Sequence, residues 1–538
     1  MFYQPGQMLM VRIPLFFTVV TVLGCSRGSD SARKPVSDSD ADADSDSDAD
    51  SDADADSDTD ADADSDSDAD SDADWGDGGT IAESTADVHI VGTDSDYLGW
   101  HQSLSVGDLN GDGVDELIAG GSYVLNGGDG GVWLMDGGSF ESWGGPITER
   151  AYGVIQGSSD SSYFATMGAR QGDQNNDGVA DLLVAGTDVY SYSGDLGVYA
   201  ASLFYGGAGA MDGSLTEADA DVLFEETTSG YWYVKALSNN DFDGDGLDDV
   251  VMGDFYTSSG THGSVYLFPG STLSTGGVLN LSDDAELEIY GDSAGDLFGY
   301  SLAGGDVDGD GLDELLAGSG GESHEGVSRS GCVYLIGGNP GGGVESDSAS
   351  SVSSLKVCGI EPHQRVGRDG SPQLVDLDGD DSLDLIISGP GAASGGTEDD
   401  GRVWAYFDVA SLSGTLTTDA ADLTLTGGAS AYFGSAVHYG DFNGDGRLEL
   451  AVGASESTSY DDAMDGPGEV FFYHFSTLSS GGILSTSGAD LHISGQGQSG
   501  FGVALSSADF NGDGAEEFIV AAHRYEDEIG RLSIFNLK

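Results

Sequence analysis

Seven short stretches of the sequence each place four oxygen-bearing side chains at fixed positions, which is the chemistry of a calcium site. The first reads DLNGDGVDELIAGG from Asp108. Calcium takes roughly six to eight oxygen ligands in flexible geometry. Side chains at positions 1, 3, 5 and 9 of each stretch, with a backbone carbonyl at position 7, would wrap one ion. We name the stretches loops 1 to 7: 108–116, 173–181, 241–249, 306–314, 376–384, 441–449 and 509–517.

The predicted ligands are all Asp, Asn or Glu. They are Asp108, Asn110, Asp112 and Glu116; Asp173, Asn175, Asp177 and Asp181; Asp241, Asp243, Asp245 and Asp249; Asp306, Asp308, Asp310 and Glu314; Asp376, Asp378, Asp380 and Asp384; Asp441, Asn443, Asp445 and Glu449; and Asp509, Asn511, Asp513 and Glu517. Loops 3, 4 and 5 offer four carboxylates each, and the other four loops carry Asn at position 3. Because ligand charge tunes affinity, we expect up to seven calcium ions, with the middle loops filling first unless Asp381 distorts loop 5.

The loops are not EF-hands, which need a bidentate Glu at position 12 and a helix after the loop. Position 12 is apolar in all seven: Ala119, Val184, Met252, Ala317, Ile387, Val452 and Val520. Glycines at positions 4 and 6 allow the left-handed backbone that turns the oxygens inward. Asn176 and Asp381 replace one glycine each, and Asn and Asp tolerate positive φ better than other side chains.

The loops recur with a period, so the elements that hold them must recur too. Successive loops begin 65, 68, 65, 70, 65 and 68 residues apart. Around each loop lie an aromatic-glycine step such as YFGSAVHYG, a short apolar run such as LAVGAS, and two further runs such as GEVFFYHF and ADLHISG. Runs of four to eight residues rich in Val, Tyr, Phe and Leu and bounded by glycine are typical of strands. Four strands in each of seven units predict an all-β, seven-bladed β-propeller of four-stranded antiparallel blades.

The two ends of the folded part are expected to share the last blade. The chain stops after GRLSIFNLK, the third strand of the seventh unit, and ADVHIVG at 86–92 matches the fourth-strand pattern. We therefore predict that residues 87–91 pair with the strand near 531–536, which removes exposed strand edges.

The repeats resemble a known family. The pattern DFNGDG followed by LAVGA after an FG step is similar to the FG-GAP repeat, which in integrin α subunits forms a seven-bladed propeller with calcium in several blades. The resemblance covers roughly residues 86–538 and implies calcium in the hairpin between the first and second strands of a blade. All seven loops of this sequence have the residues needed to bind calcium, whereas the integrin α subunits keep such residues in only some of their blades. No inserted domain or leg-like domain is recognised in the sequence, so heterodimer formation does not carry over.

The N-terminal region is expected to lie outside the fold. Residues 1–24 read as a signal peptide, and VLGC resembles the lipobox of bacterial lipoproteins, which implies lipidation of Cys25; an ordinary cleaved signal is the alternative. Residues 25–79 are expected to be a disordered Asp/Ala/Ser spacer, with Asp at every even position from 38 to 74, 19 in all. Its acidic run of 37 residues could extend about 120 Å at roughly 3.3 Å per residue. Residues 80–538 would form the propeller.

Net charge limits the classes of binding partner, and the cysteine count bears on a possible disulfide. The net charge is -79, from 95 acidic and 16 basic residues, so nucleic acid is excluded and a membrane is expected only through the lipid anchor. With Cys25 lipidated, Cys332 and Cys358 remain in an exported chain. They begin and end adjacent predicted strands, so they pair if they lie opposite and stay free thiols if the register slips by one residue.

These features predict a calcium-binding, surface-tethered propeller of the bacterial outer membrane or cell surface, or else a secreted one. It would bind an extracellular protein or glycan in an adhesion-like role, with no catalytic residues and no other cofactor. The alternative is a calcium-dependent propeller enzyme that acts on polysaccharide as a lyase or hydrolase, because propeller enzymes draw catalytic residues from several blades. Neither an acid pair shared among the units nor a basic cluster is evident in the sequence, which favours binding.

Overall fold

The computed structural model describes residues 79–93, 97–99, 103–121, 130–157, 164, 168–186, 198–226, 234–255, 262–338, 347–368, 372–391, 400–427, 432–455 and 466–538. The predicted signal peptide, the lipidation site at Cys25 and the spacer up to residue 78 lie outside these residues. Within the described ranges, no helix combines the length and apolar character needed to cross a bilayer.

Seven sheets make up the fold, and four strands of each run antiparallel from the inner edge outward. In blade 1 they are β3 (Leu104–Gly107), β4 (Glu116–Gly121), β5 (Gly131–Met135) and β7 (Gly153–Gln156). In blade 2 they are β8 (Gly168–Gly172), β9 (Asp181–Ala185), β10 (Val198–Phe204) and β12 (Val222–Glu226). In blade 3 they are β13 (Val234–Asn240), β14 (Asp249–Asp254), β15 (Ser264–Phe268) and β17 (Leu287–Tyr290).

The remaining four blades repeat this order. Blade 4 holds β18 (Phe298–Gly305), β19 (Glu314–Ser319), β20 (Cys332–Ile336) and β22 (Ser353–Cys358). Blade 5 holds β23 (Gln373–Val375), β24 (Asp384–Gly389), β25 (Arg402–Tyr406) and β27 (Leu423–Thr426). Blade 6 holds β28 (Phe433–Gly440), β29 (Glu449–Ala454), β30 (Glu469–Tyr473) and β32 (Leu491–Ser494). Blade 7 holds β33 (Phe501–Ala508), β34 (Glu517–Ala522), β35 (Arg531–Phe535) and β2 (Val88–Val91).

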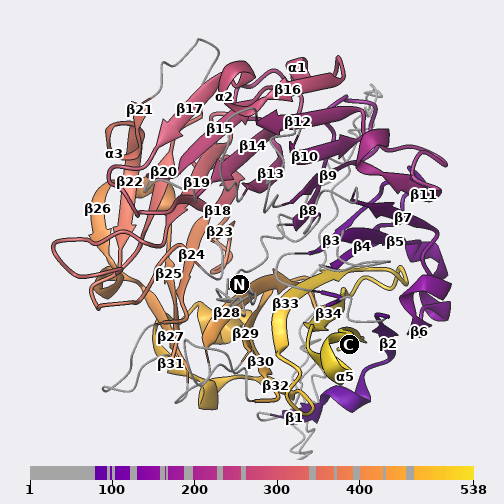
Figure 1. The fold of residues 1–538 in the computed structure, drawn as a ribbon. Coiled ribbons are helices and arrows are strands. Elements are labelled where there is room, and N and C mark those ends of the chain that lie inside the picture. Colours follow the sequence, from indigo (N-terminus) through magenta and orange to yellow (C-terminus); the bar gives the residue numbers. More distant parts are fainter. Residues whose placement is uncertain are drawn as a thin grey trace, which may run out of the picture. The chain divides into compact units, whose positions relative to one another are not determined.

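The N-terminal strand completes the last blade, as predicted. β2 pairs antiparallel with β35, with Val88 opposite Ile534 and Val91 opposite Arg531. Neighbouring sheets contact one another near their inner edges, mostly through the innermost strands, from β3 and β8 round to β33, which contacts β3 again; blades 5 and 6 meet through β24 and β28 (Figure 1). The seven-bladed propeller is therefore confirmed, and its ring is closed by a sheet built from both ends of the described chain.

Each blade has one strand more than the four predicted. A short fifth strand from the neighbouring blade adds in parallel to the outer edge of each sheet. These strands are β11 (Gly213–Thr216), β16 (Gly277–Asn280), β21 (Asp347–Ser348), β26 (Gly414–Thr417), β31 (Gly482–Ser485), β1 (Gly79–Ala82) and β6 (Gly145–Pro146), on blades 1 to 7 in that order. Except for β1, which precedes β2, each lies between the third and fourth strands of its own blade. It therefore covers an outer edge that would otherwise be unpaired.

Helices are confined to short connections. The α-helices are α1 (Gly270–Leu273), α2 (Leu281–Asp284), α3 (Ala349–Val352), α4 (Phe475–Leu478) and α5 (Tyr525–Glu528). The 3-10 helices are η1 (Glu83–Thr85), η2 (Gly137–Ser142), η3 (Ile147–Glu149), η4 (Glu217–Asp219), η5 (Val409–Ser411), η6 (Thr418–Ala420) and η7 (Thr486–Gly488).

The core lies between adjacent blades. Leu117 and Trp133 of blade 1 pack in one cluster with Ile519 and Leu532 of blade 7. Because each sheet is covered on both faces, the second strands are buried along their whole length, as in β19 and β29. This explains why their sequences are continuous apolar runs rather than alternating ones.

A phenylalanine at or before the first strand joins blades 2, 6 and 7 to the blade that precedes each of them. Phe501 begins β33 and makes a parallel bridge to Gly468, which directly precedes the third strand of blade 6. Gly468 has a φ of 74°, and a Cβ there would lie 2.1 Å from the carbonyl oxygen of Phe501. Only glycine allows this approach. The same bridge joins Gly130 to Phe164 and Gly401 to Phe433.

Candidate calcium sites

Each loop lies in the hairpin between the first and second strands of its blade. Position 9 is the first residue of the second strand in all seven blades, from Glu116 in β4 to Glu517 in β34. Positions 4 and 6 have positive φ in every loop, including 54° at Asn176 and 70° at Asp381. Asn176 and Asp381 therefore adopt the positive φ predicted for them. A strand, and not the helix of an EF-hand, follows each loop.

Hydrogen bonds from the loop backbone turn the acidic side chains inward. In loop 3, Asp241 accepts from the amides of Gly244 at 2.7 Å and Gly246 at 2.9 Å. Asp243 accepts from the amide of Asp245 at 3.0 Å. The other loops repeat the bond from the position 6 amide to the position 1 carboxylate, as in loops 1 and 7. The sequence thus folds into one turn whose carboxylates face a common centre.

The carboxylate at position 9 connects the loop to the segment that follows the third strand. One oxygen of Asp249 accepts from the amide of Phe242 at 2.9 Å, and the other accepts from the amide of Gly270 at 2.8 Å. Six of the seven position 9 residues are fully buried, and Glu314 is 7% exposed. Burial raises the pKa of Glu116 to about 8 and that of Asp249 to about 7, and nearby loop carboxylates add to both shifts. In the metal-free fold these groups resist ionisation, so a bound cation would stabilise their charged form.

The loops fall into two classes. In loops 3, 4 and 5, carboxylate oxygens from positions 1, 3 and 9 all lie within 4.8 Å of one another. In loops 1, 2, 6 and 7, the amide Nδ2 of the position 3 Asn donates to the position 9 carboxylate instead, for example from Asn110 to Glu116 at 2.6 Å and from Asn443 to Glu449 at 3.2 Å. At position 3, the Asn therefore offers a neutral hydrogen-bond donor to the position 9 carboxylate, whereas the Asp of loops 3, 4 and 5 places a second carboxylate beside it.

Residues outside the motif also reach the loops with their side chains, among them Asn536 directly after β35, which donates to Glu517 of loop 7 at 3.2 Å. Asp136, directly after β5, has an oxygen within 4.8 Å of oxygens of Asp112 and Glu116 in loop 1. His474, at the same place in blade 6, contacts Glu449 at 3.4 Å. Lys538 contacts Asp513 of loop 7 at 3.3 Å. The period of the loop motif could not reveal these residues, because the position after the third strand differs from blade to blade.

The donor set fits calcium. In loops 3, 4 and 5 the grouped donors are all carboxylate oxygens, the hard ligands that calcium prefers. In these three loops, oxygens of the side chains at positions 1, 3 and 9 lie close together. In loop 1, the position 5 carboxylate of Asp112 lies close to those of Glu116 and Asp136. Positions 1, 3, 5 and 9 would hold the ion, which would neutralise the carboxylates and fix the hairpin.

Adjacent loops are connected by backbone hydrogen bonds. The amide of position 8 in one loop donates to the carbonyl of position 1 in the loop before it, as from Asp313 to Asp241 at 3.0 Å and from Glu516 to Asp441 at 3.0 Å. The same bond joins loops 1 and 2 through Ala180 and Asp108 at 3.1 Å. A change in one loop can therefore affect its neighbour along the same rim of the propeller.

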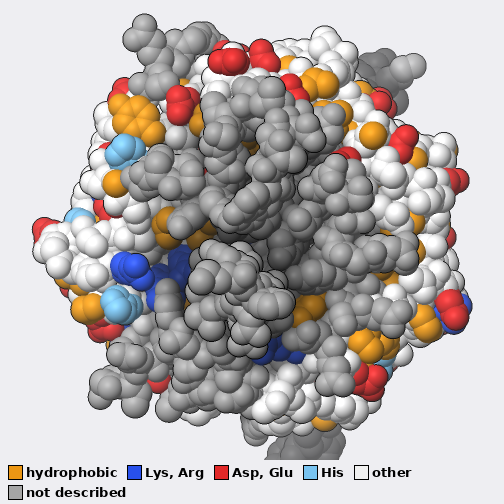
Figure 2. Space-filling model, in the orientation of Figure 1, with side chains coloured by type: hydrophobic (Ala, Val, Ile, Leu, Met, Phe, Trp, Pro, Cys, Tyr) orange, Lys and Arg blue, Asp and Glu red, His pale blue; other side chains and the backbone are white. Residues whose placement is uncertain are grey.

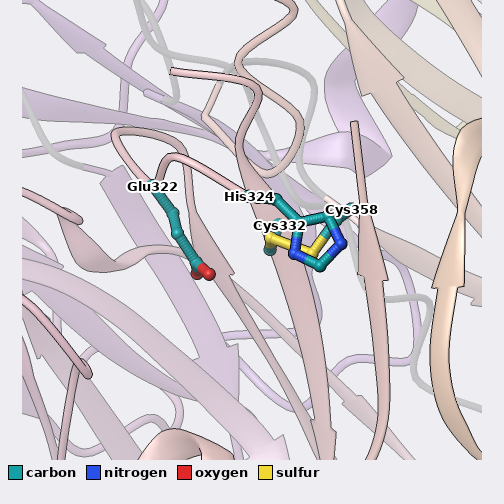
Figure 3. Close-up of side chains that lie close together, drawn as sticks. All are labelled: Glu322, His324, Cys332 and Cys358. Atoms are coloured by element: carbon teal, nitrogen blue, oxygen red, sulfur yellow. A yellow bond between two sulfur atoms is a disulfide. The ribbon is translucent and has the colours of Figure 1, made fainter. Parts of the chain in front are cut away.

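A further group of metal-ligating residue types lies in blade 4 and does not fit a metal. Glu322, His324, Cys332 and Cys358 come close together (Figure 3). Cys332 and Cys358 are directly opposite in the β20–β22 pair and form a disulfide, with a Cα–Cα distance of 4.1 Å. Their sulfurs are not thiolate ligands in this state, and Glu322 already binds Lys356 at 2.7 Å and the Tyr334 hydroxyl at 2.7 Å.

Comparisons with known proteins agree with this architecture. The FG-GAP repeat matches residues 102–135, 298–354 and 433–471. The chain is 27% identical over 46% of its length to a phosphatidylinositol-glycan-specific phospholipase D of Dictyostelium discoideum, and covers 27% of that protein. It is 28% identical over 43% of its length to integrin alpha-5 of Xenopus laevis, and covers 20% of it. The alignments thus span about a quarter of these relatives.

Among solved structures, the exotype rhamnogalacturonan lyase YesX is similar with a TM-score of 0.36 and 13% identity, over 81% of this chain and 72% of that one. This TM-score is too low to support a shared fold or activity. The repeats, the integrin relatives and the seven closed blades agree among themselves. The chain therefore carries FG-GAP repeats on a seven-bladed β-propeller of the integrin-α-like kind.

Proposed function

We propose that this chain is a calcium-stabilised, surface-tethered propeller that binds a protein or glycan outside a bacterial cell and catalyses no reaction. The observation that carries the proposal is the repetition of one loop geometry in all seven hairpins of one rim. Seven sites at equivalent places fit a structural role, because a catalytic centre would distinguish one site from the others.

The opposite rim supplies the binding surface. Antiparallel blades place the connections between strands two and three, and those between blades, at the ends away from the calcium loops. Loops held by a rigid scaffold commonly carry recognition. The connection at 321–331 is described and includes exposed Ser328 and Arg329. The other two connections expected to recognise ligand, 120–131 and 455–468, lie largely outside the described residues.

Tethering is part of the proposal. A lipid on Cys25 followed by the long aspartate spacer would hold the propeller away from the membrane, which suits contact with something beyond the cell. Cys25→Ser should abolish incorporation of labelled fatty acid and release the chain from the membrane fraction. Retention of the label in this variant would contradict lipidation at Cys25.

Binding and catalysis are separated by one pair of assays. The calcium-loaded full chain, applied to protein and glycan arrays, should bind at least one partner, and the binding should fall after chelation. Incubation with a polysaccharide panel should release no oligosaccharides. Calcium-dependent release would overturn the binding function in favour of a polysaccharide lyase or hydrolase.

A further inference from the structure

A small polar hollow lies between blades 6 and 7, away from the calcium loops. Its volume is ≈ 210 Å³, and its walls come from two connections: residues 496–499, which lead from β32 to β33, and residues 524–526, at the start of α5. The two walls are joined by a hydrogen bond from the amide of Arg524 to the carbonyl of Ser499 at 3.0 Å.

Buried charges fix both walls. Glu83, in η1 just before the ring-closing strand, is fully buried and accepts from the amide of Gln496 at 2.8 Å. It also accepts from Nε of Arg531 at 3.0 Å. The Arg531 guanidinium lies 3.7 Å from the ring centre of Tyr525. One buried ion pair therefore positions Gln496 on one wall and the Tyr525 ring on the other, so the hollow is organised before any ligand binds.

The second wall has two features that its folding does not explain. Glu526 has a φ of 46°, which is strained for a residue other than glycine, and Arg524 lies in the sparsely populated bridge region with φ -101° and ψ 11°. The Nε atom of Arg524 is buried and meets no hydrogen-bond acceptor among the described residues. Strained backbone and unsatisfied donors are enriched at binding sites, where the surrounding structure holds them in place.

The side chains around the hollow suit a hydroxyl-rich ligand. Arg524 can only donate hydrogen bonds, ionised Glu526 can only accept them, and the amide of Gln496 can do both. A sugar hydroxyl both donates and accepts, so neighbouring hydroxyls on one ring can satisfy an Arg and a Glu together. The volume is below the roughly 300–1,000 Å³ of pockets for drug-sized ligands, which limits the occupant to about one sugar unit.

Charge favours a neutral sugar over an acidic one. The net charge of -79 repels polyanions at a distance. On the face shown in Figure 2, Lys and Arg side chains of the described residues occur in small separate groups. We propose that the hollow lined by Gln496, Ser499, Arg524, Tyr525 and Glu526 binds one unit of a neutral glycan. This inference rests on the proposed binding function and names its ligand class and place.

The test compares variants of the hollow with a matched pair elsewhere. Arg524→Gln and Glu526→Gln remove the donor and acceptor charges. Glu149→Gln and Arg150→Gln make the same changes at exposed residues of blade 1, outside the hollow. The calcium-loaded full chain and each variant are applied to arrays of neutral and acidic oligosaccharides and of proteins. The affinity for the best neutral oligosaccharide is then measured by titration, and melting curves verify folding.

We expect the wild type to bind a neutral oligosaccharide, with affinity at least about tenfold weaker in R524Q and E526Q and unchanged in the two control variants. Glycan binding that is equal in all four variants would overturn the hollow as the site while leaving the proposed function intact. Binding of acidic glycans or proteins alone would overturn the ligand class. Absence of any partner would count against the proposed function itself.

Discussion

Loops 3, 4 and 5 share a backbone with loops 1, 2, 6 and 7 but differ from them at position 3. In the middle loops, Asp at this position faces the buried carboxylate of position 9, as Asp243 faces Asp249. In the other four, Asn donates its amide to that carboxylate, as Asn110 does to Glu116 at 2.6 Å. One difference between near-isosteric side chains thus separates loops whose grouped carboxylates lack an internal donor at position 3 from loops in which an Asn amide binds the position 9 carboxylate.

Loop shape and the number of carboxylates in the loop are therefore separate properties. Positive φ at positions 4 and 6 and the hydrogen bonds from the loop backbone occur in both classes. These features shape the turn. The number of carboxylates then decides how much repulsion the turn contains when no metal is bound.

The largest effect should come from removing calcium. Excess chelator should lower the melting temperature, because each filled site adds about 2.7 kcal/mol to the free energy of unfolding when free calcium is about 100 times Kd. Differential scanning calorimetry with and without chelator measures the shift. Magnesium at equal concentration is the control and should restore less of the stability. A melting curve that chelator leaves in place would refute a structural role for calcium.

The next largest effect should come from the disulfide, which shares blade 4 with loop 4. Replacing both Cys332 and Cys358 by Ser should lower the free energy of unfolding by about 2–4 kcal/mol. The decrease in the free energy of unfolding should be similar with and without calcium if calcium stabilises loop 4 independently of the rest of blade 4. Urea unfolding under both conditions provides the comparison. A loss confined to the calcium-free protein would show that the two features are coupled.

An effect of similar size to that of the disulfide is expected at position 9. Asp249→Ala leaves the buried amides of Phe242 and Gly270 without their acceptors, which should cost about 1–3 kcal/mol for each group. The loss should persist in chelator, because these bonds do not depend on the ion. Asp245→Ala is the matched control at an outer ligand of the same loop, and its effect should be largely confined to the calcium-loaded protein.

The smallest effect is the most specific for the comparison between loops. Asp243→Asn should convert loop 3 to the self-satisfied kind, and Asn511→Asp should convert loop 7 to the kind that needs a cation. Relative to wild type, the stability lost on chelation should fall by about 1 kcal/mol in the first variant and rise by a similar amount in the second. Shifts of the same sign in both variants would mean that position 3 does not control the requirement.

Much of this architecture could be predicted from sequence because it repeats. The regular spacing of the loops predicted the number of blades. The similarity of residues 86–92 to the fourth strands predicted the pairing of β2 with β35. The fifth strands were missed because runs such as GSLT at 213–216 are too short to read as strands. They form only against an edge of the neighbouring blade, which is a tertiary effect.

Contacts that do not repeat could not be read from the sequence. Glu83 and Arg531 pair across 448 positions, and no motif connects them. Asp136, His474 and Lys538 reach their loops from positions whose residue type differs in other blades. The two cysteines were recognised as neighbours, but their pairing depended on a register that strand patterns leave open by one residue. The structure places them directly opposite.

Calcium titration of the metal-stripped full chain would show whether the seven loops bind calcium and whether the four-carboxylate loops bind it most tightly. Isothermal titration calorimetry at physiological ionic strength counts the sites and separates them by affinity. We expect a first class of about three equivalents, from the three four-carboxylate loops, followed by weaker binding to the other four loops. Asp243→Asn should reduce the first class by one. Seven equivalents of a single affinity, or tightest binding that survives Asp→Asn changes in all three middle loops, would contradict this expectation.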